Sequence, residues 1–203
     1  MFGDRMNYPN GIKKHDEKET NYGNRGMILE NDINETNKFY LANNIAIIHK
    51  KPIPITITKV HYPSRFEAVI KEAYFKTPST TDYNGIYRER YIDFEAKETK
   101  NKKYFPISNI HKHQIEHLKL IIEHGGIGFI IVRFVSLDLT FYLDGKDLIE
   151  FINTNKRKSI PLAFFKQKGY IIKTRFNPRI DYLSIVDKIY FGGEHYEKSN
   201  KKD

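Results

Sequence analysis

The sequence predicts an α/β domain built on a central mixed sheet. Segments with helical or strand patterning follow one another as helix, strand, polar excursion, strands, helix, two strands and a final helix, an order typical of α/β domains. The chain has 203 residues, of which 39% are hydrophobic and 14% aromatic. It is therefore long enough and apolar enough to form one domain with a sizeable core.

The first helix is expected within residues 24–44. Positions at helical spacing there carry Leu29, Ile33, Thr36 and Tyr40. Asn43-Asn44 marks the end of this pattern. The next segment, IAIIH at 45–49, opens with an uninterrupted apolar run that suits a buried strand. The polar ends of the chain are expected to form a flexible arm at 1–23 and a tail at 193–203, on either side of a domain at 24–192.

Residues 50–79 form an excursion with Pro52 near its start and Pro78 near its end. It holds six basic residues against two acidic ones, a net charge of +4. Its aromatic residues are interleaved with these charges: Tyr62, Phe66, Tyr74 and Phe75. Two interpretations stay open. In a nucleic-acid-binding arm, cations meet phosphates and rings stack on bases, whereas in an ordinary subdomain the same rings form a small core of their own.

The segment RYIDFEAKETK, residues 90–100, alternates strictly between an apolar and a charged face, which predicts a half-buried strand. An Asn-Gly turn signal at Asn84-Gly85 precedes it. The charged face carries Asp93, Glu95 and Lys97. Such a face suits a solvated edge strand, but two carboxylates and a lysine are also what a metal-dependent nuclease needs.

The remaining pattern predicts a helix, two strands and a closing helix. The helix lies within 108–126, with Ser108 as its N-cap and Gly125-Gly126 as its stop. The strands are IGFIIVRF at 127–134 and DLTFYLD at 138–144, and RIDYLSIVDKIY at 179–190 is the closing helix.

Charge and composition narrow the class of protein. Lysine and arginine exceed aspartate and glutamate by 34 to 25, a net charge of +9, which favours nucleic acid first and an anionic membrane second as partner. The absence of cysteine excludes disulfides and thiolate metal sites. Because the start of the chain lacks a signal-peptide core and the longest apolar run is too short for a bilayer, we expect a soluble, cytoplasmic protein.

Three polar residues on or near the strand at 90–100 favour an active site over a solvated edge. Asp82 precedes the Asn-Gly turn, so Asp82 and Glu95 are predicted on paired strands with converging carboxylates, whose repulsion a bound Mg²⁺ would relieve. Lys97 follows Glu95 by two and projects from the same face, where a cation orients water or stabilises developing charge. Gln114 falls on the apolar stripe of the next helix and needs a polar partner there.

Each of these features also has a structural interpretation. A carboxylate pair beside a turn is common, a strand lysine often only solubilises an edge, and a glutamine on an apolar stripe is usually bonded to backbone. His113 and His117, four positions apart on a helix, offer a competing zinc site, although no third ligand is evident.

The order Asp…Glu-x-Lys is the pattern of the PD-(D/E)-x-K nucleases, and longer segments make the resemblance more specific. From Asn24 to Phe191 the chain resembles the RecU family of Holliday junction resolvases in NRGMILENDINETNKFY, IAIIHKKP, VHYPSR, VIKEAYFK, STTDYNGIY, RYIDFEAKETK, HQIEHL and PRIDYLSIVDKIYF. The resemblance implies a restriction-endonuclease-like fold with a protruding stalk, formed by the excursion, over which the junction crossover is held. It further implies a homodimer that makes paired, symmetric nicks in four-way DNA with Mg²⁺, for which Mn²⁺ can substitute.

Carried over position by position, the family's metal-binding residues fall on Thr80, Asp82, Glu95 and Gln114, and its catalytic set on Asp82, Glu95 and Lys97. Glu30 matches an acidic position that related nucleases place near the metal, and Asp93 shares the strand face without being required as a ligand. Thr81 stands where the motif's name expects proline, a residue without a catalytic group. The candidate DNA-binding residues are Lys50, Arg65, Phe75 and Lys76.

The expected activity is resolution of Holliday junctions in homologous recombination and DNA repair. A sequence-specific restriction-type endonuclease on the same fold, and a non-catalytic junction-binding regulator of recombination, are the alternatives. The resemblance also implies contacts with the strand-exchange recombinase and the branch-migration machinery, and no membrane partner.

Overall fold

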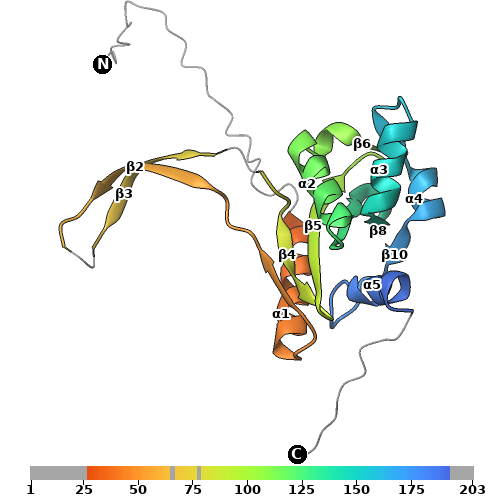
Figure 1. Cartoon of the computed structure of the whole chain (residues 1–203), viewed down its shortest axis with the longest axis horizontal. Coiled ribbons are helices and arrows are strands. Elements are labelled where there is room, and N and C mark those ends of the chain that lie inside the picture. The colour runs from red at the N-terminus through yellow and green to blue at the C-terminus, as the bar shows by residue number, and fades with distance from the viewer. Residues whose placement is uncertain (1–26, 65–66, 77–78, 193–203) are drawn as a thin grey trace, which may run out of the picture.

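A computed structural model of the chain describes residues 27–64, 67–76 and 79–192 (Figure 1). Its centre is a six-stranded sheet in the order β1-β4-β5-β7-β8-β10. These strands are β1 (Ile47–Lys50), β4 (Tyr83–Tyr87), β5 (Arg90–Thr99), β7 (Ile127–Phe134), β8 (Leu139–Asp144) and β10 (Tyr170–Ile172). All neighbours pair antiparallel except β5 and β7, which are parallel. The predicted α/β class with a central mixed sheet is confirmed.

Helices cover both faces of the sheet. On one face α1 (Met27–Ala42) and α5 (Leu183–Tyr190) pack against a core rich in aromatic rings. On the other face lie α2 (Lys112–Glu123), α3 (Gly145–Thr154) and α4 (Leu162–Lys168). Near this second layer, two short strands pair with each other, β6 (Tyr104–Pro106) and β9 (Ser159–Pro161). The sheet is therefore buried on both sides, as strands with long apolar runs require.

Strand β5 lies inside the sheet, between β4 and β7. Its predicted alternation is confirmed: Ile92 and Phe94 join the core under α1, and Asp93 and Glu95 lie on the face that α2 covers, fully buried. The solvated-edge interpretation of this strand is therefore wrong. Beneath β5, four rings stack across neighbouring strands with centroids 4.5 to 4.8 Å apart: Tyr83, Phe94, Phe129 and Tyr142.

The turn between β4 and β5 lies four residues beyond the predicted one. Arg88 and Glu89 have φ of 46° and 64°, so the chain reverses there through two left-handed residues. Asn84-Gly85 instead lies within β4. Gly85 is needed because a Cβ at this position would lie 2.0 Å from the backbone oxygen of Ile47 on β1. Gly85 is thus required because β1 lies close against β4, and not because the chain turns there.

Three further expectations need correction. Strand β1 is the edge of the sheet and is buried on one face only: Ala46 and Ile48 join the core, while Ile47 is exposed, so the prediction of a buried strand at 45–49 holds for half of its side chains. Helix α2 has His111 and not Ser108 as its N-cap, because residues 107–109 form a separate 3₁₀ turn. The closing helix begins at Leu183 and not Arg179. Gly125, with φ of 82°, does end α2 as predicted.

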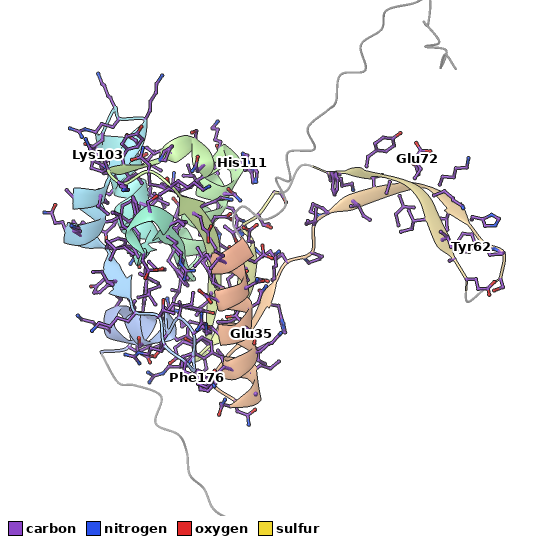
Figure 2. All side chains as sticks on the ribbon, turned by 180° about the vertical axis from the view of Figure 1, so that it is seen from behind. Glu35, Tyr62, Glu72, Lys103, His111 and Phe176 are labelled. Carbon is purple, nitrogen blue, oxygen red and sulfur yellow. The ribbon has the colours of Figure 1, made fainter. Side chains whose placement is uncertain are left out.

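The stalk is a two-stranded hairpin that projects away from the body, β2 (Ile55–His61) paired with β3 (Val69–Phe75) (Figure 1). Figure 2 shows side chains such as those of Tyr62 and Glu72 on it with no other element against them. Its described rings are exposed, and Phe75 is 81% exposed. The interpretation of these rings as a small core of their own is therefore wrong for Tyr62, Tyr74 and Phe75, while Phe66 lies outside the described residues.

Helices long and apolar enough to cross a membrane are absent from the part of the chain that the structure describes. The predicted arm at 1–23 and tail at 193–203 lie outside the described residues.

Candidate active site

Asp82 and Glu95 come together because β4 and β5 pair in antiparallel register. Tyr83 lies opposite Phe94, which places Asp82, the residue before β4, beside Glu95. The backbone N–H of Asp82 donates a hydrogen bond to Glu95 Oε2 at 3.2 Å. The pairing predicted for these two acids thus holds, although the turn that joins their strands lies elsewhere.

The Glu95 carboxyl is fully buried, and this controls its protonation. Burial, then hydrogen bonding with the Asp82 side chain, raises the pKa of Glu95 to about 8, against the opposing charge of Lys97. Lys97 Nζ lies 2.6 Å from Glu95 Oε1, an ion pair in which the lysine is only partly exposed. Oε1 nevertheless has no hydrogen bond of acceptable geometry. A second positive charge at this oxygen would favour the ionised form.

Glu30 contributes to the same negative field from α1. Burial first, and then the charges of Glu30, Asp82 and Glu95, raise the pKa of the Tyr83 hydroxyl. Glu30 itself lies in the first turn of α1, where its Oε1 pairs with Lys50 Nζ at 2.6 Å.

Thr80 and Gln114 each already have a hydrogen-bond partner. Thr80 Oγ1 donates to the backbone oxygen of Thr81 at 3.3 Å. Gln114 is buried on the inner side of α2, and its Oε1 accepts a hydrogen bond from the backbone N–H of His111 at 2.9 Å in a capping box. The backbone bond that the sequence left as the structural alternative for Gln114 is thus present.

Asp93 lies two residues before Glu95 on the same face, and it is 0% exposed. Lys51 Nζ donates to its Oδ2 at 2.7 Å, and the Thr81 hydroxyl donates to Oδ1. The Tyr91 hydroxyl donates to Oδ2 at 2.9 Å, and His117 Nε2 is 3.2 Å from the same oxygen. The sequence counted Lys51 only among the charges of the stalk, because spacing along the chain does not reveal a contact between residues 42 positions apart.

The competing histidine site is not assembled. His117 turns to Asp93, while the His113 ring stacks on His111 with centroids 5.4 Å apart. Within residues 27–64, 67–76 and 79–192 there is no group of three or more His, Cys, Asp or Glu side chains placed to hold a metal ion. The acid pair with its neighbouring oxygens therefore remains the candidate metal site.

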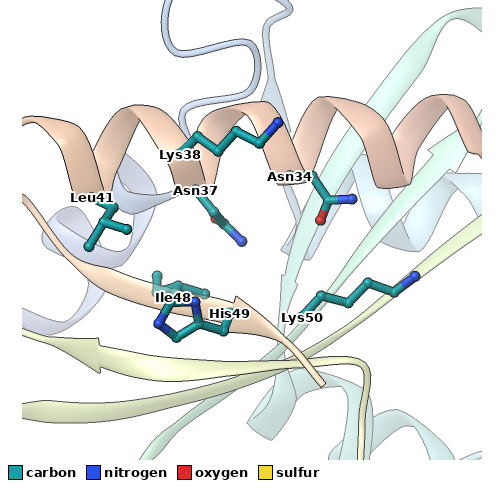
Figure 3. Close-up of a pocket in the computed structure, with 7 residues that line it drawn as sticks. All are labelled: Asn34, Asn37, Lys38, Leu41, Ile48, His49 and Lys50. Atoms are coloured by element: carbon teal, nitrogen blue, oxygen red, sulfur yellow. The ribbon is translucent and has the colours of Figure 1, made fainter. Parts of the chain in front are cut away.

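Of the four predicted DNA-binding residues, three are described. Lys50 ends β1 and pairs with Glu30, Nζ to Oε1 at 2.6 Å. It also lies at one end of a groove of about 330 Å³ between α1 and β1 (Figure 3). Lys76 and Phe75 are exposed at the end of β3, and Lys76 N–H donates to the backbone oxygen of Pro54. Arg65 lies outside the described residues.

The residues present fit a hard divalent cation. Mg²⁺ prefers carboxylate and amide oxygens, and a buried carboxyl whose pKa is raised by burial and a second acid gains most from a nearby cation. Asp82 and Glu95 are the residues that would hold such an ion.

Two carboxylates and a lysine on neighbouring strands of a mixed sheet reproduce the pattern of the PD-(D/E)-x-K class. The family model "Recombination protein U" matches residues 24–188, and the chain belongs to this RecU family. A relative from Bacillus cytotoxicus, named Holliday junction resolvase RecU, is 51% identical over 92% of this chain and 98% of its own length. One from Bacillus mycoides with the same name is 50% identical, with the same coverage. Archaeoglobus fulgidus Hjc aligns over 72% of this chain and 95% of its own, with a TM-score of 0.43 and 12% identity.

Proposed function

We propose that the chain is a Mg²⁺-dependent, structure-selective endonuclease that resolves Holliday junctions in recombination and repair. The observation that carries this proposal is that Glu95 on β5 contacts both Asp82, the residue before β4, and Lys97 in a member of the RecU family. Residues 24–192 would form the nuclease domain, acting in the cytoplasm.

In this proposal Asp82 and Glu95 hold the cation, and Lys97 acts beside them. The ion, when bound, supplies Lewis-acid polarisation of the scissile phosphate and offsets the charge that develops on it. A cation there would favour the ionised form of Glu95, and Glu95 would in turn hold Lys97, 2.6 Å from it, beside the scissile phosphate. There its ammonium group orients the attacking water and stabilises the negative charge of the transition state. Hydrolysis would leave 5′-phosphate and 3′-hydroxyl ends.

Substrate selection is assigned to the stalk. It exposes Phe75 beside Lys76 at the end of β3 in the projecting hairpin (Figure 1), so a ring and a cation are presented together. The open centre of a four-way junction exposes base faces and crowded phosphates, which these two groups would recognise. The symmetry of a junction further suggests a C₂ homodimer, since two matched nicks need two active sites related by a similar axis.

The test is cleavage of synthetic four-way junctions and of plain duplex, with Mg²⁺ or with chelator, beside an Asp82→Asn variant. We expect junction nicking that requires Mg²⁺ and Asp82, with little duplex cleavage. Mn²⁺ should replace Mg²⁺. Sequence-dependent duplex cutting would favour a restriction-type enzyme, and binding without cleavage would favour a non-catalytic regulator.

A further inference from the structure

Asp93 ties both ends of the stalk to the strand that carries Glu95. Lys51 follows β1 directly, where the chain leaves the body for the stalk, and Thr81 lies where the chain returns to it. Both side chains donate to the same buried carboxylate, Lys51 to Oδ2 at 2.7 Å and Thr81 to Oδ1. Lys51 also donates to Thr81 Oγ1 at 3.2 Å, so the three groups form a closed triangle.

This triangle also fixes the position of Asp82. The backbone N–H of Lys51 donates to the backbone oxygen of Asp82 at 2.7 Å. Thr81 directly precedes Asp82 in the chain. Asp82 is therefore held from both sides by residues that Asp93 anchors. Its own N–H then bonds Glu95.

Asp93 has further partners on the other side. Tyr91, on the same strand, donates to Oδ2 and accepts a hydrogen bond from Asn84 on β4 at 3.1 Å. His117 brings α2 to within 3.2 Å of the same oxygen. Asp93 is 0% exposed and is bonded to four side chains. A buried carboxylate is costly unless its hydrogen bonds are made, so these partners hold the cluster in one well-defined geometry.

We propose that Asp93 is a positioning residue that sets the geometry of the Asp82–Glu95 cation site and couples it to the stalk. Resting on the proposed function, the inference is that a junction held by the stalk lies in register with the cation site because both are anchored to one carboxylate. In this proposal Asp93 acts through Lys51 and Thr81, without contacting the cation or the substrate itself.

Metal binding without DNA tests this directly. We would titrate Mg²⁺ and Mn²⁺ into wild type, Asp93→Asn and Lys51→Met, and follow the rise in melting temperature. Partners that orient metal ligands typically contribute 10- to 100-fold to metal affinity or activity. We expect Asp93→Asn and Lys51→Met each to raise the half-saturating Mg²⁺ concentration about tenfold. The double variant should be little worse than the worse single one, because both changes remove the same contact.

Asp187→Asn is the matched control. Asp187 is also 0% exposed and accepts hydrogen bonds from Tyr87 at 2.8 Å and from Arg88 at 3.2 Å, but it lies on α5, on the opposite face of the sheet. Its loss should lower the melting temperature and leave the half-saturating Mg²⁺ concentration unchanged. If Asp93→Asn behaves in the same way, Asp93 is structural only and the inference is overturned.

Single-turnover cleavage on the same preparations separates this inference from the proposed function. At limiting Mg²⁺, Asp93→Asn should cut bound junction about tenfold more slowly, with junction affinity within about twofold of wild type. A wild-type protein that binds Mg²⁺ but does not cut junctions would sink the proposed function, while the titration would still decide the role of Asp93. A wild-type protein with no metal-dependent shift would overturn both.

Discussion

Replacing Glu95 by glutamine should stabilise the metal-free protein at alkaline pH. The pKa of Glu95 rises from 4.5 to about 8 because the folded protein buries it beside Asp82. Between these values the folded state holds a proton that the unfolded chain has released, so the free energy of unfolding falls as the pH rises, by about 1.4 kcal/mol per pH unit. The total loss in the free energy of unfolding is about 5 kcal/mol at most, and it is complete above pH 8. Glutamine cannot ionise, so the variant avoids it.

The pKa of about 8 already includes the opposing charge of Lys97, so no further offset for the lost ion pair applies. We therefore expect Glu95→Gln to exceed wild type by up to about 5 kcal/mol at pH 8.5 in chelator, or roughly 10–20 °C in melting temperature for a chain of this size. At pH 5.5, one unit above the ordinary pKa of 4.5, the difference should fall to about 1.4 kcal/mol, because the unfolded chain has released the proton that the folded wild type still holds. Added Mg²⁺ should stabilise wild type and not the variant.

The assay is thermal unfolding of both proteins at the two pH values, with chelator and with Mg²⁺. The comparison between them cancels the titration of all other groups, including the eight histidines. An equal difference at pH 5.5 and pH 8.5 would show that Glu95 titrates normally in the folded protein. The case for a cation at this carboxyl would then lose its electrostatic basis.

Three further predictions concern catalysis, assembly and the stalk. Lys97→Ala should abolish nicking but keep junction binding in gel shifts, because the side chain adds little phosphate contact; near-normal nicking would remove it from the catalytic set. Light scattering should report about twice the chain mass of 24.0 kDa, and a monomer making coordinated paired nicks would contradict the dimer. Phe75→Ala should weaken junction binding more than duplex binding without lowering the melting temperature, because the ring is exposed; Lys76→Ala should weaken both and flatten the salt dependence. Equal losses for Phe75→Ala, with lower stability, would mean that the ring packs in the folded protein.

Sequence reasoning found the acid pair because strand periodicity is local. Alternation along β5 fixes which side chains share a face, and the antiparallel register then brings Asp82 to Glu95. The same reasoning misplaced the turn, since a glycine required by the approach of β1 has the same signature as a glycine in a turn. It also took β1 for a buried strand, because apolar composition does not distinguish a sheet edge from its centre.

The contacts of Asp93 could not be predicted from local sequence patterns, for a different reason. Lys51, Thr81 and His117 approach one carboxylate only after the stalk has left and rejoined the sheet and α2 has packed across it. The chain distances involved are 42, 12 and 24 positions, and no spacing rule links them. Periodicity could place Asp93 on the active face, but only the packed structure shows that its partners are the two ends of the stalk.

The exposure of the stalk bears most strongly on substrate. An isolated two-stranded hairpin is marginally stable in water at best, and β2 and β3 expose apolar side chains on both strands, including Ile57, Ile70 and Phe75. A nuclease body with its own two-sided core does not need this hairpin for folding. Its rings and cations are better explained by a surface that is covered during function. If Asp93 has the positioning role proposed above, whatever covers the stalk would be held in a set position relative to the acid pair, because Lys51 and Thr81 anchor both ends of the stalk to it. For a branched DNA with a fixed distance from crossover to scissile phosphate, such an arrangement would convert recognition of shape into choice of the bond.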